Sequence, residues 1–191
     1  MDKTLEQCIR KVTAEKVKIV PYDPLWKEAF KNEAENLRKI LPDSIVIRIE
    51  HFGSTAVPQI SAKPIIDMLI EVTSLEKTKS RIVPLLVSRG YEYFWRPTFT
   101  GQTDYYAWFI KRGNDGNRSH HLHMVEANSI IWDALLFRDY LTEFPGEAHN
   151  YEKLKIFLSS QYTNDRIAYT KGKTNYIQKI TQTAKQYYAM H

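Results

Sequence analysis

Residues 51–72 read HFGSTAVPQISAKPIIDMLIEV, and this stretch decides the fold. A glycine-serine turn leads into an apolar run that carries three charged residues, Lys63, Asp67 and Glu71. A strand that is buried on both faces consists mostly of Val, Ile and Leu, and an unpaired carboxylate inside it is costly. The strand therefore either borders a functional site or buries Asp67 in an ion pair of its own.

Side chains along a strand alternate between its two faces. If a strand covers residues 64–72 and pairs with another at 44–54, one of its faces is apolar and the other is mixed. The apolar face is expected to be core and comprises Ile66, Met68 and Ile70. The mixed face comprises Lys63, Ile65, Asp67, Leu69 and Glu71. It offers an ammonium group for phosphate and a carboxylate for a metal ion, although an ion pair of Asp67 with Lys63 or an arginine explains these charges without a ligand.

The composition suits one folded domain with a sizeable core, because the 191 residues are 43% hydrophobic and 26% charged. Lys and Arg number 27 against 22 Asp and Glu, so the formal charge is +5. A positive charge favours anionic partners such as nucleotides, other phosphorylated small molecules or nucleic acid, without choosing among them.

The single cysteine, Cys8, excludes an internal disulfide framework and a cluster of thiolates for structural zinc. The N-terminal residues lack the apolar segment of a signal peptide, and no stretch approaches the roughly 18 uninterrupted apolar residues of a membrane span. The sequence therefore predicts a cytoplasmic protein with no membrane partner.

The order of predicted elements indicates an α+β fold, in which a mixed β-sheet is flanked by helices and followed by C-terminal helices. One domain is expected, with an N-terminal extension (1–16), a sheet core (17–126) and a helical part (127–191). Strands are predicted at 17–23, 44–54, 64–72, 91–99, 105–113 and 120–127, the last three as an antiparallel meander. Helices are predicted at 2–16, 23–41, 74–89 with a kink or break at Pro84, 129–144, 146–162 and 174–190.

The turn at Gly53, Ser54 and Thr55 is a candidate phosphate site, because such a turn presents backbone N–H groups and hydroxyls to an anion. The same residues also occur in ordinary turns. His51 lies three residues before Ser54, and a histidine there is either a general base or phosphate contact, or a structural residue.

His121 and His123 alternate with Leu122, so both imidazoles project from one face of a strand. This pattern offers two nitrogen atoms to one metal ion or phosphate, and the alternative is a pair of half-exposed histidines near a turn. Arg118 lies close by in the sequence and suits an anion in either case.

Two further cations are candidate phosphate contacts, Arg138 and Lys173. Arg138 precedes Asp139 within an apolar helix, where the two cannot both face the core. Lys173 ends the sequence YTKGK (169–173), which with Arg166 predicts an anion-binding loop before the last helix. The alternative for this loop is a solvated run of charge.

Five motifs, taken in order, resemble one family of small bacterial proteins. Residues 49–72 are similar to the GrpB signature, which runs close to IEHVGSTAVPGLxAKPIIDILVEV. The other motifs are VPYDPLWKEAFKNE (20–33), HHLHMVE (120–126), LLFRDYL with EAHNYEKLK (135–141 and 147–155) and YTKGKTNYI (169–177). The resemblance covers about residues 17–181.

The GrpB family is similar to the nucleotidyltransferase fold, and this resemblance implies a site. In that fold a glycine-serine turn follows the first strand, and a pair of aspartates on the next strand holds a divalent metal for the nucleotide phosphates. The second aspartate lies about thirteen residues after the serine, as Asp67 does after Ser54. The first aspartate then falls on Ile65, or on Leu69 in a shifted register, so one of the paired acids is absent.

The resemblance also implies which residues replace the usual ligands. The implied cofactor is a divalent metal ion, Mg²⁺, Mn²⁺ or Zn²⁺, held by Asp67, His121 and His123. The two histidines stand where a third acid is expected, and they favour a softer metal such as Mn²⁺ or Zn²⁺, or direct contact with phosphate. Gln59 stands where relatives usually have glycine, which alters the approach of that loop to a phosphate.

Three functions follow from these residues. The favoured one is a metal-dependent nucleotidyltransferase acting on a nucleoside triphosphate and an unknown acceptor, with Lys63, Asp67 and His123 as catalytic residues and Glu71 as an alternative base. The second is a binding module for a nucleotide or an acidic metabolite without catalysis. The third is a single-metal hydrolase that uses His51, Asp67, His121 and His123.

Overall fold

The computed structural model describes residues 15–98 and 105–190. The helix predicted at 2–16 lies outside this part of the chain, apart from residues 15 and 16, which are not helical. Most of the N-terminal extension expected at 1–16 and the turn expected at 100–104 lie outside it as well.

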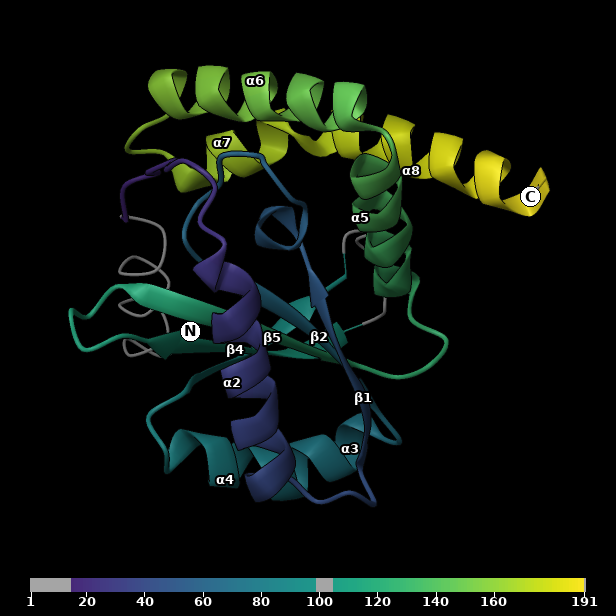
Figure 1. Ribbon diagram of the computed structural model, residues 1–191. Coiled ribbons are helices and arrows are strands. Elements are labelled where there is room, and N and C mark those ends of the chain that lie inside the picture. Colours follow the sequence, from purple (N-terminus) through teal and green to yellow (C-terminus); the bar gives the residue numbers. More distant parts are fainter. Residues whose placement is uncertain (1–14, 99–104, 191) are drawn as a thin grey trace.

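Five strands form one mixed sheet in the order β1-β2-β5-β4-β3 (Figure 1). The strands are β1 (Val46–Phe52), β2 (Ile66–Val72), β3 (Glu92–Pro97), β4 (Tyr105–Arg112) and β5 (Arg118–Val125). Strands β2 and β5 run parallel, and the other neighbouring pairs are antiparallel. The α+β fold with a mixed sheet is confirmed, and β3 to β5 form the expected meander.

Helices cover both faces of the sheet (Figure 1). On one side lie α2 (Leu25–Ile40), α3 (Leu75–Lys77) and α4 (Val83–Val87). On the other lie α5 (Asp133–Glu143), α6 (Pro145–Gln161), α7 (Arg166–Gly172) and α8 (Thr174–Met190). Short turns of 3₁₀ helix occupy Ser54–Ala56 and Ile130–Trp132.

The two faces of β2 differ as the sequence pattern predicts. Ile66, Met68 and Ile70 are buried in the main core, which they share with residues of α2. The opposite face carries Asp67, and the parallel register places it beside His121 of β5. The polar residues of β2 therefore lie on the side of the sheet that the C-terminal helices cover.

Strand β2 begins at Ile66, two residues later than predicted. The amide of Ile65 donates to the carbonyl of Lys63 at 2.7 Å, which closes a three-residue turn around Pro64. The prediction that Lys63 shares a strand face with Asp67 is therefore wrong, because Lys63 belongs to the loop before the strand. The strand predicted at 17–23 is likewise reduced to a single bridge between Val20 and Ala62.

The segment predicted as a kinked helix at 74–89 is divided, as Pro84 requires. A π-helical stretch, Thr78–Ile82, separates α3 from α4, and Pro84 lies in the first turn of α4. Gly90 follows with φ of +84°, the left-handed conformation that ends many helices.

The prediction of a loop at 169–173 is wrong, because most of this segment is helical. Helix α7 contains residues 169–172, and Lys173 lies at its C-terminal end. The carboxylate of Asp165 accepts hydrogen bonds from the amides of Ile167 and Ala168, at 3.1 and 2.9 Å, and so caps this helix. The C-terminal part thus has four α-helices among the described residues rather than three.

Within residues 15–98 and 105–190, the helices are too short or too polar to cross a lipid bilayer.

Gln59 has a backbone φ of +63°, whereas most residues avoid this left-handed region. This conformation explains why glycine suits the position. A Gln59→Gly variant is expected to be more stable by about 0.5–1 kcal/mol, since the left-handed conformation costs about 1–2 kcal/mol and glycine loses part of this gain through its greater entropy when unfolded. Urea denaturation measures the difference.

Gln178→Gly provides the matched control, because Gln178 is exposed within α8. This substitution should destabilise the protein by about 1 kcal/mol. A loss of stability in Gln59→Gly as well would show that the Gln59 side chain makes a contact worth more than its backbone strain.

Candidate functional site

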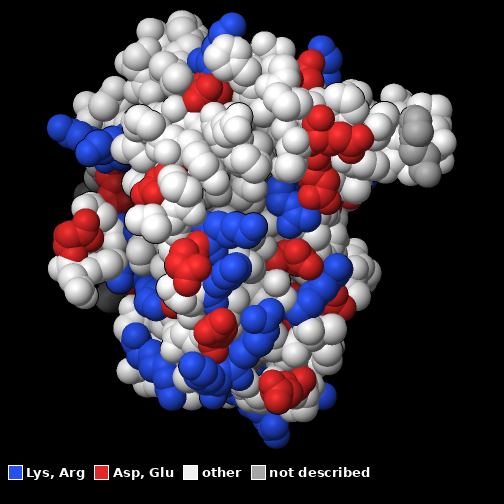
Figure 2. Space-filling view, viewed as in Figure 1, with Lys and Arg blue, Asp and Glu red and all other residues white. Residues whose placement is uncertain are grey.

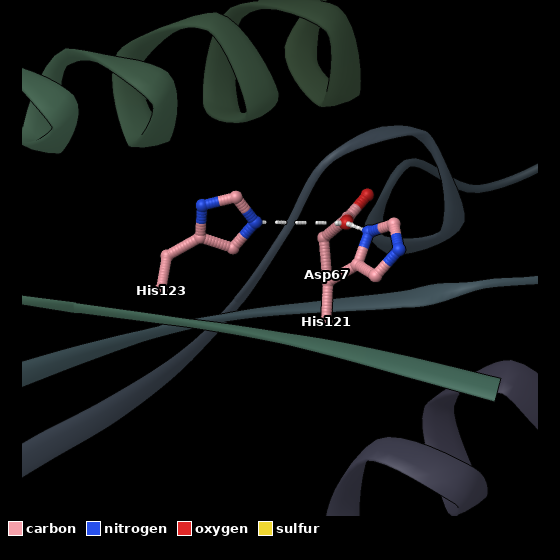
Figure 3. Close-up of side chains that lie close together, drawn as sticks. All are labelled: Asp67, His121 and His123. Atoms are coloured by element: carbon pink, nitrogen blue, oxygen red, sulfur yellow. Dashed lines mark hydrogen bonds and ion pairs between the residues drawn. The ribbon is translucent and has the colours of Figure 1, made fainter. Parts of the chain in front are cut away.

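Three side chains from two neighbouring strands meet on the polar face of the sheet (Figure 3). Asp67 Oδ1 lies 2.9 Å from Nδ1 of His121 and 3.9 Å from Nε2 of His123. The parallel pairing of β2 with β5 places Asp67 beside His121, and His123 follows one pleat further on. The Asp67 side chain remains 29% exposed, so a ligand can reach this cluster.

Gly53 is required at the turn because the Asp67 carboxylate fills the space of a side chain. A Cβ atom on Gly53 would lie 2.5 Å from Asp67 Oδ2 and 3.2 Å from Asp67 Cγ. Gly53 also has φ of +73°, which other residues rarely adopt. The backbone of the predicted phosphate turn therefore packs directly against the predicted metal ligand.

His51 and Thr55 support this turn through hydrogen bonds within the protein. Thr55 Oγ1 donates to the carbonyl of Ile65 at 3.3 Å and accepts from Nε2 of His51 at 3.1 Å. The His51 ring also stacks on Phe30, with ring centroids 4.7 Å apart. Burial lowers the pKa of His51 to about 4. His51 thus holds the turn in place as a neutral imidazole.

The environment keeps Asp67 ionised and the two histidines neutral. Burial alone would raise the pKa of Asp67, but the hydrogen bond from His121 and the electrostatic effects of both imidazoles and Lys63 outweigh it and hold this pKa at about 2. Burial lowers the pKa of His121 to about 4 and that of His123 to about 3, although Asp67 opposes both shifts. The cluster therefore offers one anionic oxygen and two neutral imidazoles at pH 7.

Aromatic rings account for the burial of the two histidines. Tyr106 stacks on His123 with ring centroids 5.5 Å apart, and Phe52 meets the same imidazole edge to face at 5.0 Å. Trp108 lies 5.0 Å from His121. These rings exclude water from the imidazoles, which disfavours their charged forms.

The donor atoms of Asp67, His121 and His123 fit a divalent metal ion. Each residue offers one ligand atom, and the three atoms lie within 4.8 Å of one another. Two imidazoles and one carboxylate suit Zn²⁺ or Mn²⁺ better than Mg²⁺, which prefers oxygen ligands. The fold therefore brings together the three residues that the sequence predicts as metal ligands, and their binding of a metal ion stays a prediction.

Arg118 determines which nitrogen of His121 carries the proton. Its Nη1 lies 3.4 Å from Nε2 of His121, and a guanidinium group can only donate. Nε2 is therefore the acceptor, and Nδ1 carries the proton that it donates to Asp67. A metal ion bound at Nδ1 requires this proton to move to Nε2 and Arg118 to turn away from it.

Lys63 and Lys173 both lie close to one aromatic ring. The Nζ atoms lie 5.3 Å and 4.5 Å, respectively, from the ring centroid of Tyr169 in α7. Within residues 15–98 and 105–190, neither lysine has a carboxylate at ion-pairing distance. Two partly buried ammonium groups therefore lie near each other without an ion-paired carboxylate from the described part of the chain.

The environment of Lys63 and Lys173 lowers the pKa of both ammonium groups. Burial and the neighbouring Lys173 and Arg166 lower the pKa of Lys63 well below its usual value. Burial lowers the pKa of Lys173 to about 8, and Arg166 adds to this shift while Asp67 opposes it. A bound anion would stabilise the charged forms of both buried lysines, which is the property expected of a phosphate site.

Sequence reasoning missed Lys155, which is 1% exposed and donates from Nζ to the carbonyl of Ser61. Burial lowers its pKa to about 7. Helical periodicity would have found it, since Ala148, Tyr151, Lys155 and Leu158 form the buried stripe of α6. Lys155 thus ties α6 to the loop that leads to Lys63.

Arg138 and Glu71 are already engaged in contacts within the protein. Arg138 donates to the carbonyl of His51 at 2.7 Å and pairs with Asp139 at 2.7 Å. Glu71 pairs with Arg48 at 2.7 Å, four residues along β2 from Asp67. The role of Arg138 in phosphate binding stays a prediction, while its contact with His51 supports the end of β1.

A Gly53→Ala variant is expected to lose about 1–3 kcal/mol of stability and to displace the Asp67 carboxylate, because of the 2.5 Å contact and the positive φ. Urea denaturation measures the stability. Gly90→Ala is the matched control, since Gly90 has φ of +84° but no atom within 4 Å of the added Cβ. Equal losses in the two variants would show that backbone strain alone, and not Asp67, requires glycine at position 53.

Comparison with known proteins gives a family match over most of the chain. The GrpB protein family matches residues 16–183. UPF0157 protein YqkA of Bacillus subtilis is 39% identical over 173 residues, which are 90% of this chain and 48% of YqkA, so the chain spans about half the length of that relative.

One solved structure agrees closely with the fold. The crystal structure of conserved protein GrpB from Enterococcus faecalis superposes with a TM-score of 0.77 at 34% identity, over 90% of this chain and 99% of that one. A structure of the Cid1 poly(U) polymerase matches with a TM-score of 0.48 at 13% identity, over 80% of this chain and 46% of that one, a likeness that carries no information about activity. The motifs, the family match over residues 16–183 and the shared structure together place this chain in the GrpB family.

Proposed function

We propose that the chain binds a nucleotide or another phosphorylated small molecule beside Asp67. One observation carries this proposal: Lys63 and Lys173 both lie against Tyr169 without an anionic partner among the described residues. Buried cations are costly unless they are paired, so a site of this kind is most stable when it holds an anion.

The Gly53 turn supplies the second element of the proposed site. The turn can lie close to Asp67 because Gly53 has no side chain. His51 and Thr55 support the turn from within the protein. Phosphate oxygens would accept hydrogen bonds from the turn and from the two lysines. Ser54 lies at the same turn and hydrogen-bonds to Tyr151, so it would contribute through its backbone.

The position of the cations that carry the proposal suits a small ligand. Figure 2 shows many lysine and arginine side chains over the part of this face formed by α2, α3 and α4, with aspartate and glutamate side chains among them. Nucleic-acid surfaces usually gather lysines and arginines on one face or groove. The positive groups that carry the proposal are instead partly buried at the C-terminal helices.

Lys63→Met and Lys173→Met are each expected to weaken the binding of ATP or tripolyphosphate about 10–100-fold, because a hydrogen bond to a charged group contributes about 1.5–3 kcal/mol. Isothermal titration calorimetry measures the affinity. Lys171→Met is the control, since Lys171 is exposed at the C-terminal end of α7, two residues before Lys173. The proposal is contradicted if wild-type protein binds neither compound at millimolar concentration. It is also contradicted if all three variants bind these compounds as tightly as the wild type.

The pH dependence of the same affinity should follow Lys173. Its pKa of about 8 means that the charged form, which binds phosphate, is lost as the pH rises from 7 to 9. Binding should weaken over this interval, whereas Lys173→Arg should bind with less pH dependence because arginine stays charged. A wild-type affinity that is constant from pH 7 to 9 would contradict the role of Lys173.

A second function, transfer of a nucleotidyl group to an acceptor, is favoured by the Asp67, His121 and His123 cluster. A metal ion held by these residues would neutralise phosphate charge and polarise the reacting phosphoryl group. The chain's own contribution is to keep Asp67 ionised and the imidazoles neutral beside the proposed phosphate site. Leu69, at one candidate place of the missing paired acid, is fully buried and offers no ligand atom, so this cluster would hold the metal ion with one carboxylate and two imidazoles.

Metal binding separates this function from simple binding of an anion. Asp67→Asn and His123→Ala should each lower the affinity for Zn²⁺ or Mn²⁺ at least about tenfold, because each removes one of three ligands. His149→Ala is the control, since the His149 side chain is 61% exposed and pairs with Glu152 away from this cluster. Calorimetry on protein purified without a histidine tag measures these affinities.

Equal metal affinities in all of these proteins would exclude the metal site. If ATP binding survives a chelator and Asp67→Asn unchanged, the chain is a binding module rather than a transferase or a metal-dependent hydrolase.

A further inference from the structure

One carboxylate, that of Glu15, is held by three arginines. Glu15 lies 2.9 Å from Nη1 of Arg112, 2.7 Å from Nε of Arg118 and 3.1 Å from Nη1 of Arg166. Arg112 ends β4, Arg118 begins β5 and Arg166 begins α7, so three elements direct their guanidinium groups at one point. The side chains of Arg118 and Arg166 are only 3% and 11% exposed.

Arg166 keeps hydrogen-bonding capacity that Glu15 does not use. Arg112 has a second carboxylate, Glu92, at 2.6 Å, whereas Glu15 is the only carboxylate that pairs with Arg166 among the described residues. Nη2 of Arg166 is buried and has no hydrogen-bond acceptor in this part of the chain. The arrangement suits a group with more acceptor oxygens and more charge than one carboxylate, such as a phosphate.

The arginines adjoin the lysines of the proposed phosphate site. Arg166 and Tyr169 lie one turn apart in α7, and the Tyr169 ring contacts Lys63 and Lys173. Arg118 reaches the same region from the sheet, because its Nη1 lies 3.4 Å from His121. Two groups of cations therefore adjoin each other, one without an anion among the described residues and one that holds Glu15.

We infer that Arg118 and Arg166 form a second anion position of the same site, and that Glu15 occupies it as an internal competitor that a bound ligand displaces. The inference rests on the proposed function and narrows its ligand class. A ligand with two or more linked phosphates spans both positions, with one phosphate at Lys63 and Lys173 and another at the arginines. A monophosphate fills only the lysine position and leaves Glu15 in place.

Glu15→Gln should raise the affinity for tripolyphosphate about tenfold, because the arginines no longer have to release a competing carboxylate. The affinity for inorganic phosphate should change less than about threefold. Glu92→Gln is the matched control: it removes the same charge from the same group of arginines, but Glu92 contacts only Arg112 among them. Calorimetry at fixed ionic strength measures all three proteins with both compounds.

A second measurement observes Glu15 directly in the wild-type protein. The side-chain carboxyl carbon of Glu15 should shift in a ¹³C NMR spectrum when tripolyphosphate is added, and should not shift when inorganic phosphate is added. Glu15→Gln/Arg166→Gln should lose the gain in tripolyphosphate affinity that Glu15→Gln shows.

The outcomes separate this inference from the proposed function. If tripolyphosphate binds the wild type through Lys63 and Lys173 but Glu15→Gln gives no gain and the Glu15 carboxyl resonance does not move, only the competitor role of Glu15 is overturned. If Glu92→Gln gives the same gain as Glu15→Gln, the effect is one of net charge, and the inference is again overturned. If no protein binds tripolyphosphate or ATP, the proposed function fails as well.

Discussion

The contact between the Asp67 carboxylate and the backbone of Gly53 is the constraint on which the site depends. It joins the start of β2 to the turn that follows β1, and it leaves room for no side chain at position 53. The hydrogen bond from His121 then ties the same carboxylate to β5. Because one ionised group meets the turn, the neighbouring strand and the imidazoles, these parts have a fixed geometry before any ligand arrives.

The C-terminal helices complete the site by adding positive charge to a negatively charged centre. Helix α7 brings Tyr169 and Arg166, and Lys173 follows at its end. Lys155 of α6 is buried beneath the loop before β2. Burial is the main cause of the lowered pKa values of Lys63, Lys155 and Lys173, and neighbouring cations lower them further. An anion stabilises the charged forms of buried cations, which is the physical basis of the proposed binding of phosphates.

Much of this arrangement follows from local sequence patterns. The alternation of Ile66, Met68 and Ile70 with polar residues predicts the core face of β2, and the spacing of His121 and His123 predicts that both imidazoles face the same side. Alternation extended through Pro64 predicts a strand position for Lys63, whereas Lys63 lies in the loop before β2. The glycine and lysines of residues 169–173 predict a loop, whereas Asp165 caps a helix, α7, that contains most of them.

The contact of Glu15 with Arg112, Arg118 and Arg166 has no local signal, since it joins residues up to 151 positions apart. Periodicity and motif spacing describe neighbours along the chain, whereas this ion-pair group depends on where β4, β5 and α7 end in space. The family resemblance predicts a metal and phosphate site near Asp67, but only the structure shows that Lys63 and Lys173 have no ion-paired carboxylate among the described residues and that three arginines contact Glu15.

The most direct test of the central claim, that this site is built for an anion, is an NMR titration of lysines labelled with ¹³C at Cε. In the free protein Lys173 should titrate near pH 8, and saturating tripolyphosphate should raise its pKa, because the anion stabilises the ammonium form. A Lys173 pKa at the usual value for lysine in the free protein, unchanged by tripolyphosphate, would contradict the claim.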